Sequence, residues 1–324
     1  MKNSSEFTII SKYFAPISDQ MIGKKLSDDA AVLKIQDGKE LVISSDMLIS
    51  GVHFKEEESP DFIARKALRV NLSDIAAMGA IPKFYLLSLG LKKDLDDNWI
   101  KLFCNGLELD QKEYNFKLIG GDTVSTKQEL AISITILGEI NNNKSISRSG
   151  AKLGDNIYVS GNIGDAFCGL KLLNSKKVIS EKNEKFLVNR YRLPIPRVSL
   201  GQKLVDVASS SIDVSDGLVA DLDHICKNSR VGAKLHLSSI PFSKELKSIF
   251  YKQQDFTLSA ITWGDDYEIL FTASIEKDDY ISQISKELGV KITKIGKIID
   301  EKKVFVLDDN GQDIDLITKG YSHR

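Results

Sequence analysis

Residues 59–79 read SPDFIARKALRVNLSDIAAMG, and this stretch decides how the first half of the chain folds. Ser59 and Pro60 are typical of a helix start, and Gly79 is typical of a helix end. At about 100° per residue, the apolar side chains gather into two stripes, one with Ala67 and one with Leu68. The sequence therefore predicts a helix with two apolar stripes, and Asp74 lies within one of them.

A carboxylate among apolar neighbours needs a compensating partner. Burying an unpaired charge costs roughly several kcal/mol even after relaxation. Asp74 therefore requires a cation, a basic side chain or hydrogen-bond donors. One interpretation is a metal site, and the other is a structural ion pair with Arg65 or Lys66; the helix alone does not decide between them.

Strand-like and helix-like runs alternate on both sides of this helix. Further helices are expected at 96–114, 218–227 and 277–288. Strands are expected at 41–46 (ending in Asp46), 83–91, 116–119 (closed by Gly120, Gly121 and Asp122), 129–140, 156–160, 208–214 and 267–273, with 292–299 and 304–307 as a hairpin. The chain is therefore predicted to mix helices and sheets throughout.

A polar stretch from Asn141 to Gly150 separates two such series of elements. It follows one alternating run and precedes another, which is typical of a domain boundary. We therefore predict two domains, an N-terminal one over 1–140 and a C-terminal α+β one over 141–324.

Composition limits the function classes. The 324 residues are 42% hydrophobic and 27% charged, with a net charge of -1, so no broad positive field favours nucleic acid. The three cysteines Cys104, Cys168 and Cys226 form no disulfide framework or zinc pattern. The N-terminus resembles no signal peptide, and no run approaches about 18 uncharged apolar residues. A soluble, cytoplasmic protein without a membrane partner is expected.

Further carboxylates are predicted at strand ends or helix starts, where open sheets place ligands. They are Asp28 with Asp29, Asp46, Asp122, and Asp213 with Asp216 around Ser215. Singly, Asp122 is explained as a turn residue, and Ser215 as a helix cap followed by a first-turn acid. Together these acids are typical of oxygen ligands for Mg²⁺.

A nucleotide would explain why so many acids gather, because several Mg²⁺ ions between carboxylates and polyphosphate convert repulsion into attraction. No G-x-x-x-x-G-K-[ST] string or protein-kinase motif pair occurs in the sequence. The spacing of His53, Arg148, Asp265 and Tyr321 is unremarkable, so the pattern by itself assigns them no role.

Five strings, in order, resemble the motif series of the thiamine-monophosphate kinase family. They are NLSDIAAMGA (71–80), IGGDT (119–123), RSGAKLGD (148–155), IDVSDGL (212–218) and GDDYE (264–268). The resemblance covers essentially the whole chain. It implies the α+β fold of the aminoimidazole ribonucleotide synthetase superfamily. In that fold the N-terminal domain (1–140) would bind metal and ATP and dimerise through its sheet, and the C-terminal α+β domain (141–324) would complete the active site.

The resemblance also implies a reaction, in which the γ-phosphoryl group of ATP moves to thiamine monophosphate with the help of several Mg²⁺ ions. Because the acceptor phosphate is already ionised at neutral pH, no general base is assigned. By position in the motifs, the implied magnesium ligands are Asp29, Ser44, Ser45, Asp46, Asp74, Asp122, Asp213 and Asp216. The implied ATP contacts are Gly121, Asp122, Arg148 and Ser215, and the implied substrate contacts are His53, Asp265, Thr318 and Tyr321.

The chain departs from the family pattern in three places. Residues 25–29 read KLSDD where the family shows G-x-G-D-D. Trp263 to Glu268 read WGDDYE in place of G-G-E-D-Y-E, so Asp265 replaces a longer Glu. Thr318 stands where an aromatic residue is frequent, which leaves Tyr321 as the nearby aromatic side chain.

Two alternative functions remain. One is a different ATP-using enzyme of the same superfamily, such as the ring-closing synthetase; the absence of a cysteine before Cys104 argues against selenophosphate synthesis. The other is a non-catalytic protein that binds a nucleotide or a thiamine phosphate. Against the second stands the set of clustered carboxylates, which would repel one another in a protein that binds no cation.

Overall fold

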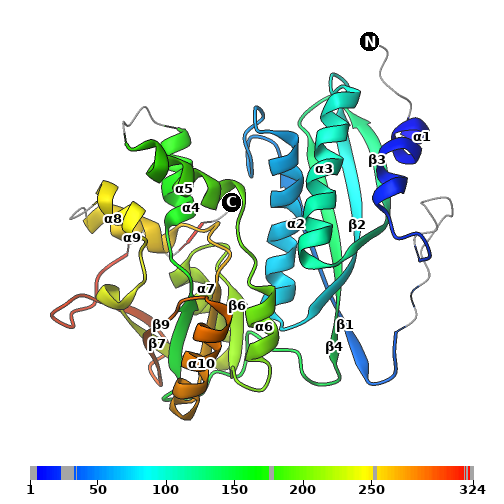
Figure 1. The fold of residues 1–324 in the computed structure, drawn as a ribbon. Helices are drawn as coiled ribbons and strands as arrows, with labels where there is room; N and C mark the ends of the chain where they lie inside the picture. Colours follow the sequence, from blue (N-terminus) through cyan, green and yellow to red (C-terminus); the bar gives the residue numbers. More distant parts are fainter. Residues whose placement is uncertain are drawn as a thin grey trace. The chain divides into compact units, whose positions relative to one another are not determined.

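The computed structural model describes residues 6–22, 33, 35–174, 179–250, 254–316, 318, 320 and 321. The chain forms two compact units, one of Met1–Ile75 and Ala80–Asn143 and one of Ala76–Gly79 and Lys144–Arg324. Each unit combines helices with its own sheet (Figure 1), which confirms the predicted α+β class. The separate roles predicted for the two domains are not tested by this division and stay predictions.

The first unit is built on a sheet of four strands in the order β1-β4-β2-β3. Its strands span Lys39–Ile49 (β1), Ile81–Lys92 (β2), Lys117–Thr126 (β3) and Ala131–Asn141 (β4). β4 pairs antiparallel with both β1 and β2, and β2 pairs parallel with β3. β1 and β3 are therefore the two edge strands.

Helices α2 (Pro60–Ala77) and α3 (Asp97–Tyr114) lie side by side against one face of this sheet (Figure 1). Both helices were predicted, and both apolar stripes of α2 are buried, with Ala67 and Leu68 fully inaccessible. The burial of these stripes fixes which face of α2 meets the sheet. Asp74, on the same face, is only half-buried.

Buried charges tie the two helices together. Arg69 of α2 donates two hydrogen bonds to the Asp110 carboxylate of α3, at 2.8 and 2.9 Å. Arg65 also donates to Asp110, at 2.8 Å, and to Glu113. Arg65 is thus engaged by two acids of α3, which argues against Arg65 as the partner of Asp74 in the ion-pair alternative.

The predicted strand ends at Asp46 and at Gly120 were wrong. β1 continues to Ile49, and β3 continues through both glycines to Thr126. The reason is pairing, because β1 keeps a continuous register with β4, and β3 keeps one with β2 beyond Leu86. Asp46 and Asp122 therefore lie within edge strands and not at strand ends.

The N-terminal segment covers only the start of the β3 edge. After α1 (Glu6–Ile9), Ser18 forms a parallel bridge with Leu118, and the Asp19 N–H donates to the Leu118 carbonyl at 2.6 Å. In the described part of the chain, the pairing of β3 on this side extends no further than Leu118.

The second unit contains a mostly antiparallel sheet of six strands in the order β10-β7-β9-β5-β8-β6. Its strands span Asn156–Ser160 (β5), Ser210–Asp213 (β6), Gly232–His236 (β7), Ile269–Ala273 (β8), Ile292–Ile299 (β9) and Val304–Leu307 (β10). Its helices span Asp165–Leu173 (α4), Glu181–Arg192 (α5), Val198–Leu204 (α6), Leu218–Ser229 (α7), Lys244–Phe250 (α8), Gln254–Thr262 (α9) and Asp278–Leu288 (α10).

Helix α7 supplies one side of the main core of this unit. Its buried Leu218, Leu222 and Ile225 pack with sheet residues such as Ile157 and Leu270. This packing fixes the N-terminal end of α7 at the end of β6, where Asp213 lies. None of the helices in the described residues has the length and apolar character needed to cross a bilayer.

The predicted hairpin of β9 and β10 was wrong. β7 lies between them, antiparallel to β9 and parallel to β10. Both strands form as predicted, but strand pairing depends on the whole sheet. The hairpin was predicted because the two strands are neighbours in the sequence. In the sheet, β9 pairs with β5 and β7.

Candidate active site

The first candidate cluster forms where β1 faces α2. Ser44 and Asp46 point to the helix-covered side of the sheet, because Asp46 pairs in register with the fully buried Ile134. The Ser44 hydroxyl donates to Asp74 Oδ2 at 2.6 Å. Asn71, one turn before Asp74, accepts the Asp46 N–H through Oδ1 at 3.1 Å. Strand and helix thus bring two carboxylates and a hydroxyl together.

The electrostatics of this cluster suit a cation. Burial raises the pKa of Asp46 to about 6, and the charge and hydrogen bond of the neighbouring Asp74 add to the shift. Two carboxyl groups that share a hydrogen bond must hold a proton between them. A divalent cation with oxygen ligands can take the place of that proton, so the donor set present here fits Mg²⁺.

Asn71 is a residue of this cluster that the sequence analysis did not assign. Its amide nitrogen donates to the Ala67 carbonyl at 3.0 Å, which orients its oxygen toward the Asp46 N–H. Asn71 is fully buried within the helix that carries Asp74. The signal available in the sequence was an amide three residues before Asp74, on the same face of the predicted helix.

The structure does not bring Asp122 close to Asp46 within one chain. Across the sheet, Asp122 shares a row with Ser88, Ser133 and Met47, whereas Asp46 shares the adjacent row with Ile134. Adjacent rows face opposite sides of a sheet. The two residues also lie on opposite edge strands, three strand spacings or about 14 Å apart. Ser45 lies on the same open face as Asp122.

Gly121 has a structural reason to be glycine. Its φ is 154°, and a Cβ there would lie 1.8 Å from the Leu87 carbonyl oxygen. The close approach of β2 and β3 therefore excludes any side chain at this position. Its predicted contact with ATP would have to use the backbone.

His53 lies in the turn that follows β1. Its Nδ1 accepts the Ile49 N–H at 3.0 Å, so the neutral ring carries its proton on Nε2. A protonated Nε2 can donate to a phosphate oxygen, and the predicted contact of His53 with the thiamine phosphate stays a prediction. The tautomer follows from the local backbone and could not be read from the sequence.

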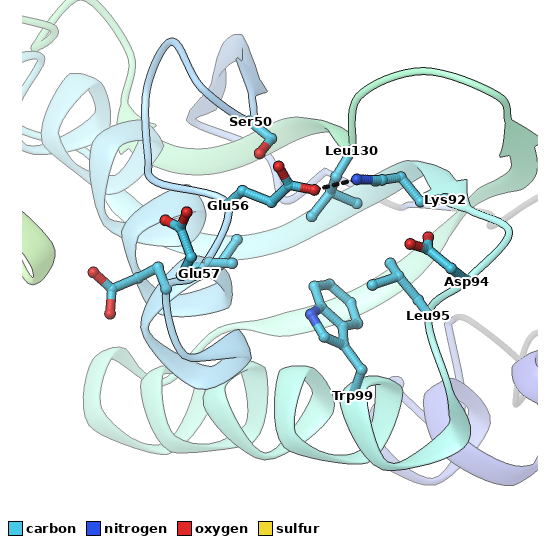
Figure 2. Close-up of a pocket in the computed structure, with 10 residues that line it drawn as sticks. Ser50, Glu56, Glu57, Lys92, Asp94, Leu95, Trp99 and Leu130 are labelled. Atoms are coloured by element: carbon cyan, nitrogen blue, oxygen red, sulfur yellow. Dashed lines mark hydrogen bonds and ion pairs between the residues drawn. The ribbon is translucent and has the colours of Figure 1, made fainter.

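A separate pocket of about 340 Å³ lies in the first unit between the end of this turn and α3. Figure 2 shows its acidic lining, with Glu56 paired to Lys92 and with Asp94 and Trp99 across the cavity. The lining includes none of the predicted site residues. The pocket is therefore distinct from the cluster around Asp46.

The second candidate cluster surrounds the loop between β6 and α7. Asp213 ends β6 with 3% of its surface exposed, and Ser215 and Asp216 follow before α7 begins. Asp221 Oδ2, one turn into α7, accepts the N–H groups of Ser215, Asp216 and Gly217, each at 3.1 Å. These bonds hold the loop in one conformation.

Asp221 was not predicted as a site residue. Burial and the charge of Asp216 raise its pKa to about 7, although the three backbone donors lower it. Asp216, Asp221 and His224 can also place ligand atoms within 4.8 Å of one another. The signal in the sequence was an acid in the first turn of the predicted helix that follows Ser215 and Asp216.

Two predicted substrate residues are attached to the same loop. The Asp265 N–H donates to the Ser215 carbonyl, and the Tyr321 N–H donates to the Asp216 carbonyl, both at 2.9 Å. A Cβ at Gly264 would lie 1.7 Å from the Ser215 oxygen, so glycine permits this contact. Asp265 itself has a φ of 68°, a strained conformation that is frequent at functional sites.

A buried ionic network holds the strand behind Asp265. Glu268 is fully buried and accepts hydrogen bonds from Arg190 at 2.9 Å and from Arg197 through both oxygens at 2.6 Å. Ser160 donates to the same carboxylate at 2.6 Å. The sequence analysis did not identify these arginines, because their partner lies more than 70 residues away.

The remaining predicted residues are less constrained by the structure. Arg148 and Thr318 are exposed, and each belongs to the second unit. Asp29 lies outside the described residues. The roles assigned to all of these residues stay predictions.

Two family models match the chain. The one described as AIR synthase related protein, N-terminal domain, matches residues 27–140. The one described as AIR synthase related protein, C-terminal domain, matches residues 152–309. The first match falls on the first structural unit except for Ala76–Gly79, and the second match lies within the second unit.

Curated relatives align with the chain from end to end. Thiamine-monophosphate kinase of Buchnera aphidicola subsp. Acyrthosiphon pisum is 39% identical over 322 residues, which cover 98% of each chain. Thiamine-monophosphate kinase of Escherichia coli (strain K12) is 38% identical over 321 residues, again 98% of each chain.

Solved structures agree with these sequence matches. The crystal structure of thiamine-monophosphate kinase from Stenotrophomonas maltophilia K279a is 37% identical, with a TM-score of 0.82 over 89% of this chain and 91% of that chain. The structure of AaThiL complexed with AMPPCP and TMP is 32% identical, with a TM-score of 0.80 over 98% of this chain and 97% of that chain.

Proposed function

The chain belongs to the thiamine-monophosphate kinase family, and on that premise we propose that it transfers the γ-phosphoryl group of ATP to thiamine monophosphate, releasing thiamine diphosphate and ADP. The observation that carries this proposal is the match over 98% of both chains to kinases of this activity. It confirms the resemblance inferred from the five motif strings.

We propose that Mg²⁺ ions are bound by the oxygen-rich residues predicted from the sequence. These are Asp29, Ser44, Ser45, Asp46, Asp74, Asp122, Asp213 and Asp216. The Ser44–Asp74 hydrogen bond and the raised pKa of Asp46 support a cation site between β1 and α2. Bound Mg²⁺ would neutralise phosphate charge, which is the main requirement of phosphoryl transfer.

The protein's own groups would then bind and align the two substrates. Gly121, Arg148 and Ser215 are proposed ATP contacts, and His53 is a proposed donor to the thiamine phosphate through Nε2. Asp265 and Tyr321, with Thr318, are proposed to face the thiamine moiety. The fixed loop at Ser215 supports alignment, because preorganised donors lower the entropic cost of the reaction.

We further propose that the enzyme is a homodimer that joins through the open face of the first sheet. That face exposes Ile43, Met47 and Val124 by 60%, 58% and 54% of their surfaces. A second copy whose β3 approached the β1 edge would bring its Asp122 to Ser45 on the open face, and so to the strand that carries Asp46. Within one chain the width of the sheet keeps these residues apart. From the composition of the chain, we also propose that the enzyme is cytoplasmic and has no nucleic-acid or membrane partner.

A direct assay tests the function. Purified protein with Mg-ATP is incubated separately with thiamine monophosphate, thiamine and formylglycinamidine ribonucleotide, and ADP and product are followed by chromatography. Thiamine diphosphate is expected only from the monophosphate. Product from the ribonucleotide would instead identify the ring-closing activity, and ATP binding without turnover would identify a binding protein.

Mg²⁺ is expected to stabilise the protein more at neutral than at acidic pH. The folded-state pKa of Asp46 lies above its unfolded value, so stability is lost as pH rises from 3.8 to about 6. Above that range Mg²⁺ meets two carboxylates without a competing proton. Thermal unfolding should show a Tm increase of about 2–6 °C near pH 7.5 and about 1 °C or less near pH 5.

The control for this measurement is NaCl at matched ionic strength, which should give the same small effect at both pH values. An equal Mg²⁺ effect at the two pH values would remove the proton-competition argument. It would leave the kinase proposal itself untouched.

A further inference from the structure

A row of aromatic rings leads from the core of the second unit to its surface. Phe167, which is 3% exposed, contacts Phe256 and Trp263, in each case with ring centroids 5.3 Å apart. Trp263 in turn contacts Tyr321, with centroids 5.7 Å apart and planes inclined by 54°. Trp263 is half-buried and Tyr321 is 41% exposed, so the row ends in an accessible aromatic pair.

Backbone hydrogen bonds place this pair beside the loop at Ser215 and Asp216. The Tyr321 N–H donates to the Asp216 carbonyl at 2.9 Å. Asp265, two residues after Trp263, donates its N–H to the Ser215 carbonyl at the same distance. The backbones of Tyr321 and Asp265 are therefore both hydrogen-bonded to the proposed nucleotide and metal loop, and Trp263 contacts Tyr321. The Asp265 carboxylate accepts a hydrogen bond from the Tyr267 hydroxyl at 3.2 Å.

Such an assembly has the chemistry to bind a planar organic cation. A cation over an aromatic face is attracted by the ring quadrupole, and Trp is the strongest of the aromatic side chains in this respect. A nearby carboxylate adds charge attraction and can accept a hydrogen bond from an amino group. Thiamine monophosphate carries both features, a cationic thiazolium ring and an aminopyrimidine.

We propose that Trp263, together with Tyr321, forms the aromatic surface that binds the cationic ring of thiamine monophosphate. The proposal rests on the kinase function and adds Trp263 as a specificity-determining residue. Thr318, although exposed in the same C-terminal segment, offers a hydroxyl and a methyl group but no aromatic face. Trp263 supplies an aromatic face in contact with Tyr321 of that segment.

A role of Trp263 in packing alone would require a different property of its side chain than cation binding does. Contact with Phe167 requires only an apolar side chain, which leucine also provides. Binding of a cation requires a ring. Variants that retain apolar volume but differ in aromatic character therefore separate the two roles.

Steady-state kinetics give the first test. Trp263→Leu should raise the KM for thiamine monophosphate by about tenfold and leave the KM for ATP within about twofold, while Trp263→Phe should stay within about threefold of the parent enzyme for both. Thermal unfolding of both variants checks that the fold persists. Equal effects of Leu and Phe, or a rise in both KM values, would overturn the proposal.

Fluorescence gives a second test that does not depend on turnover. The chain has two tryptophans, and Trp99 belongs to the separate acidic pocket of the first unit. In a Trp99→Phe variant, which should retain full activity, Trp263 is the sole tryptophan. Titration with thiamine monophosphate without ATP should change its emission with saturation, and an unchanged emission at concentrations above the KM would contradict the contact.

A thiamine monophosphate analogue without the positive charge on its ring tests whether that charge contributes to binding. An analogue in which carbon replaces the thiazolium nitrogen keeps the shape and loses the positive charge. The parent enzyme should bind this analogue about tenfold more weakly than thiamine monophosphate, and Trp263→Leu should bind both alike. If the parent enzyme forms no thiamine diphosphate at all, the function fails; if it does and Trp263→Leu discriminates as the parent does, only the role of Trp263 fails.

Discussion

Replacing Asp74 with asparagine is expected to lower kcat by roughly 100- to 1,000-fold while the fold persists. Asparagine keeps the shape of the side chain and an oxygen that accepts the Ser44 hydroxyl, but it removes the negative charge. The loss of charge weakens cation binding between β1 and α2. Steady-state kinetics across a range of Mg²⁺ concentrations measure the effect.

The same substitution should leave thermal stability without Mg²⁺ unchanged or higher. The charge of Asp74 helps to raise the pKa of Asp46, so its removal relieves repulsion in the empty site. The stabilisation by Mg²⁺ near neutral pH should disappear. Asp37→Asn, an exposed acid in the turn before β1, is the matched control and should change neither quantity.

The opposite outcome would be equally informative. An unchanged kcat with a lower Tm would mean that Asp74 holds an ion pair, with Lys66 as its partner, and no metal. Arg65 does not enter this alternative, because it donates to Asp110 and Glu113.

Two inactive variants are expected to restore activity when they share a dimer. Asp46→Asn and Asp122→Asn should each lower kcat by about 100-fold or more as homodimers. In a mixed dimer purified through two different tags, one site receives Asp46 from one chain and Asp122 from the other. That dimer should recover about half of the parent activity, because one of its two sites is complete.

The mixed dimer also has a binding readout. Mg²⁺-dependent binding of a non-hydrolysable ATP analogue, measured by calorimetry, should saturate at about one molecule per mixed dimer and about two per parent dimer. The matched control is a mixed dimer of Asp46→Asn and Asp74→Asn. Those two residues belong to one cluster of one chain, so this pair should recover nothing.

The two mixed dimers together decide the proposal. If both stay inactive while the parent enzyme is dimeric, Asp122 acts on its own chain or has no role in the site. If the parent enzyme is a monomer in solution, the proposed dimer is wrong. Neither result would affect the assay for thiamine diphosphate.

The sequence predicted most elements of the fold because their signals are local. The stripes of α2, the alternation of β4 and the boundaries of α7 all follow from side-chain periodicity within one element. The predicted hairpin of β9 and β10 failed because pairing depends on a third strand, β7, which lies some 60 residues earlier in the chain. The strand end expected at Gly120 failed because β3 keeps its pairing with β2 through both glycines, and β2 approaches Gly121 too closely for any side chain there.

For the candidate site, too, some features were predictable from the sequence and others depended on the tertiary structure. By itself, the sequence identified the oxygen-rich residues that we propose as ligands, since the motif strings around Asp74, Asp122 and Asp216 occur in the order of the family pattern. Only the tertiary structure decided which of them meet. It joined Asp46 to Asp74 through strand-to-helix packing and separated Asp122 by the width of a sheet.

The structure also supplied the residues that hold the site in place. Asp221, Asn71 and the Trp263–Tyr321 pair act through contacts with distant or backbone groups, for which a single sequence carries no periodic signal. Chemical identity is local to a residue and can be read from the chain. Proximity arises from the burial of surfaces far apart in the sequence, so it is decided only when the chain folds.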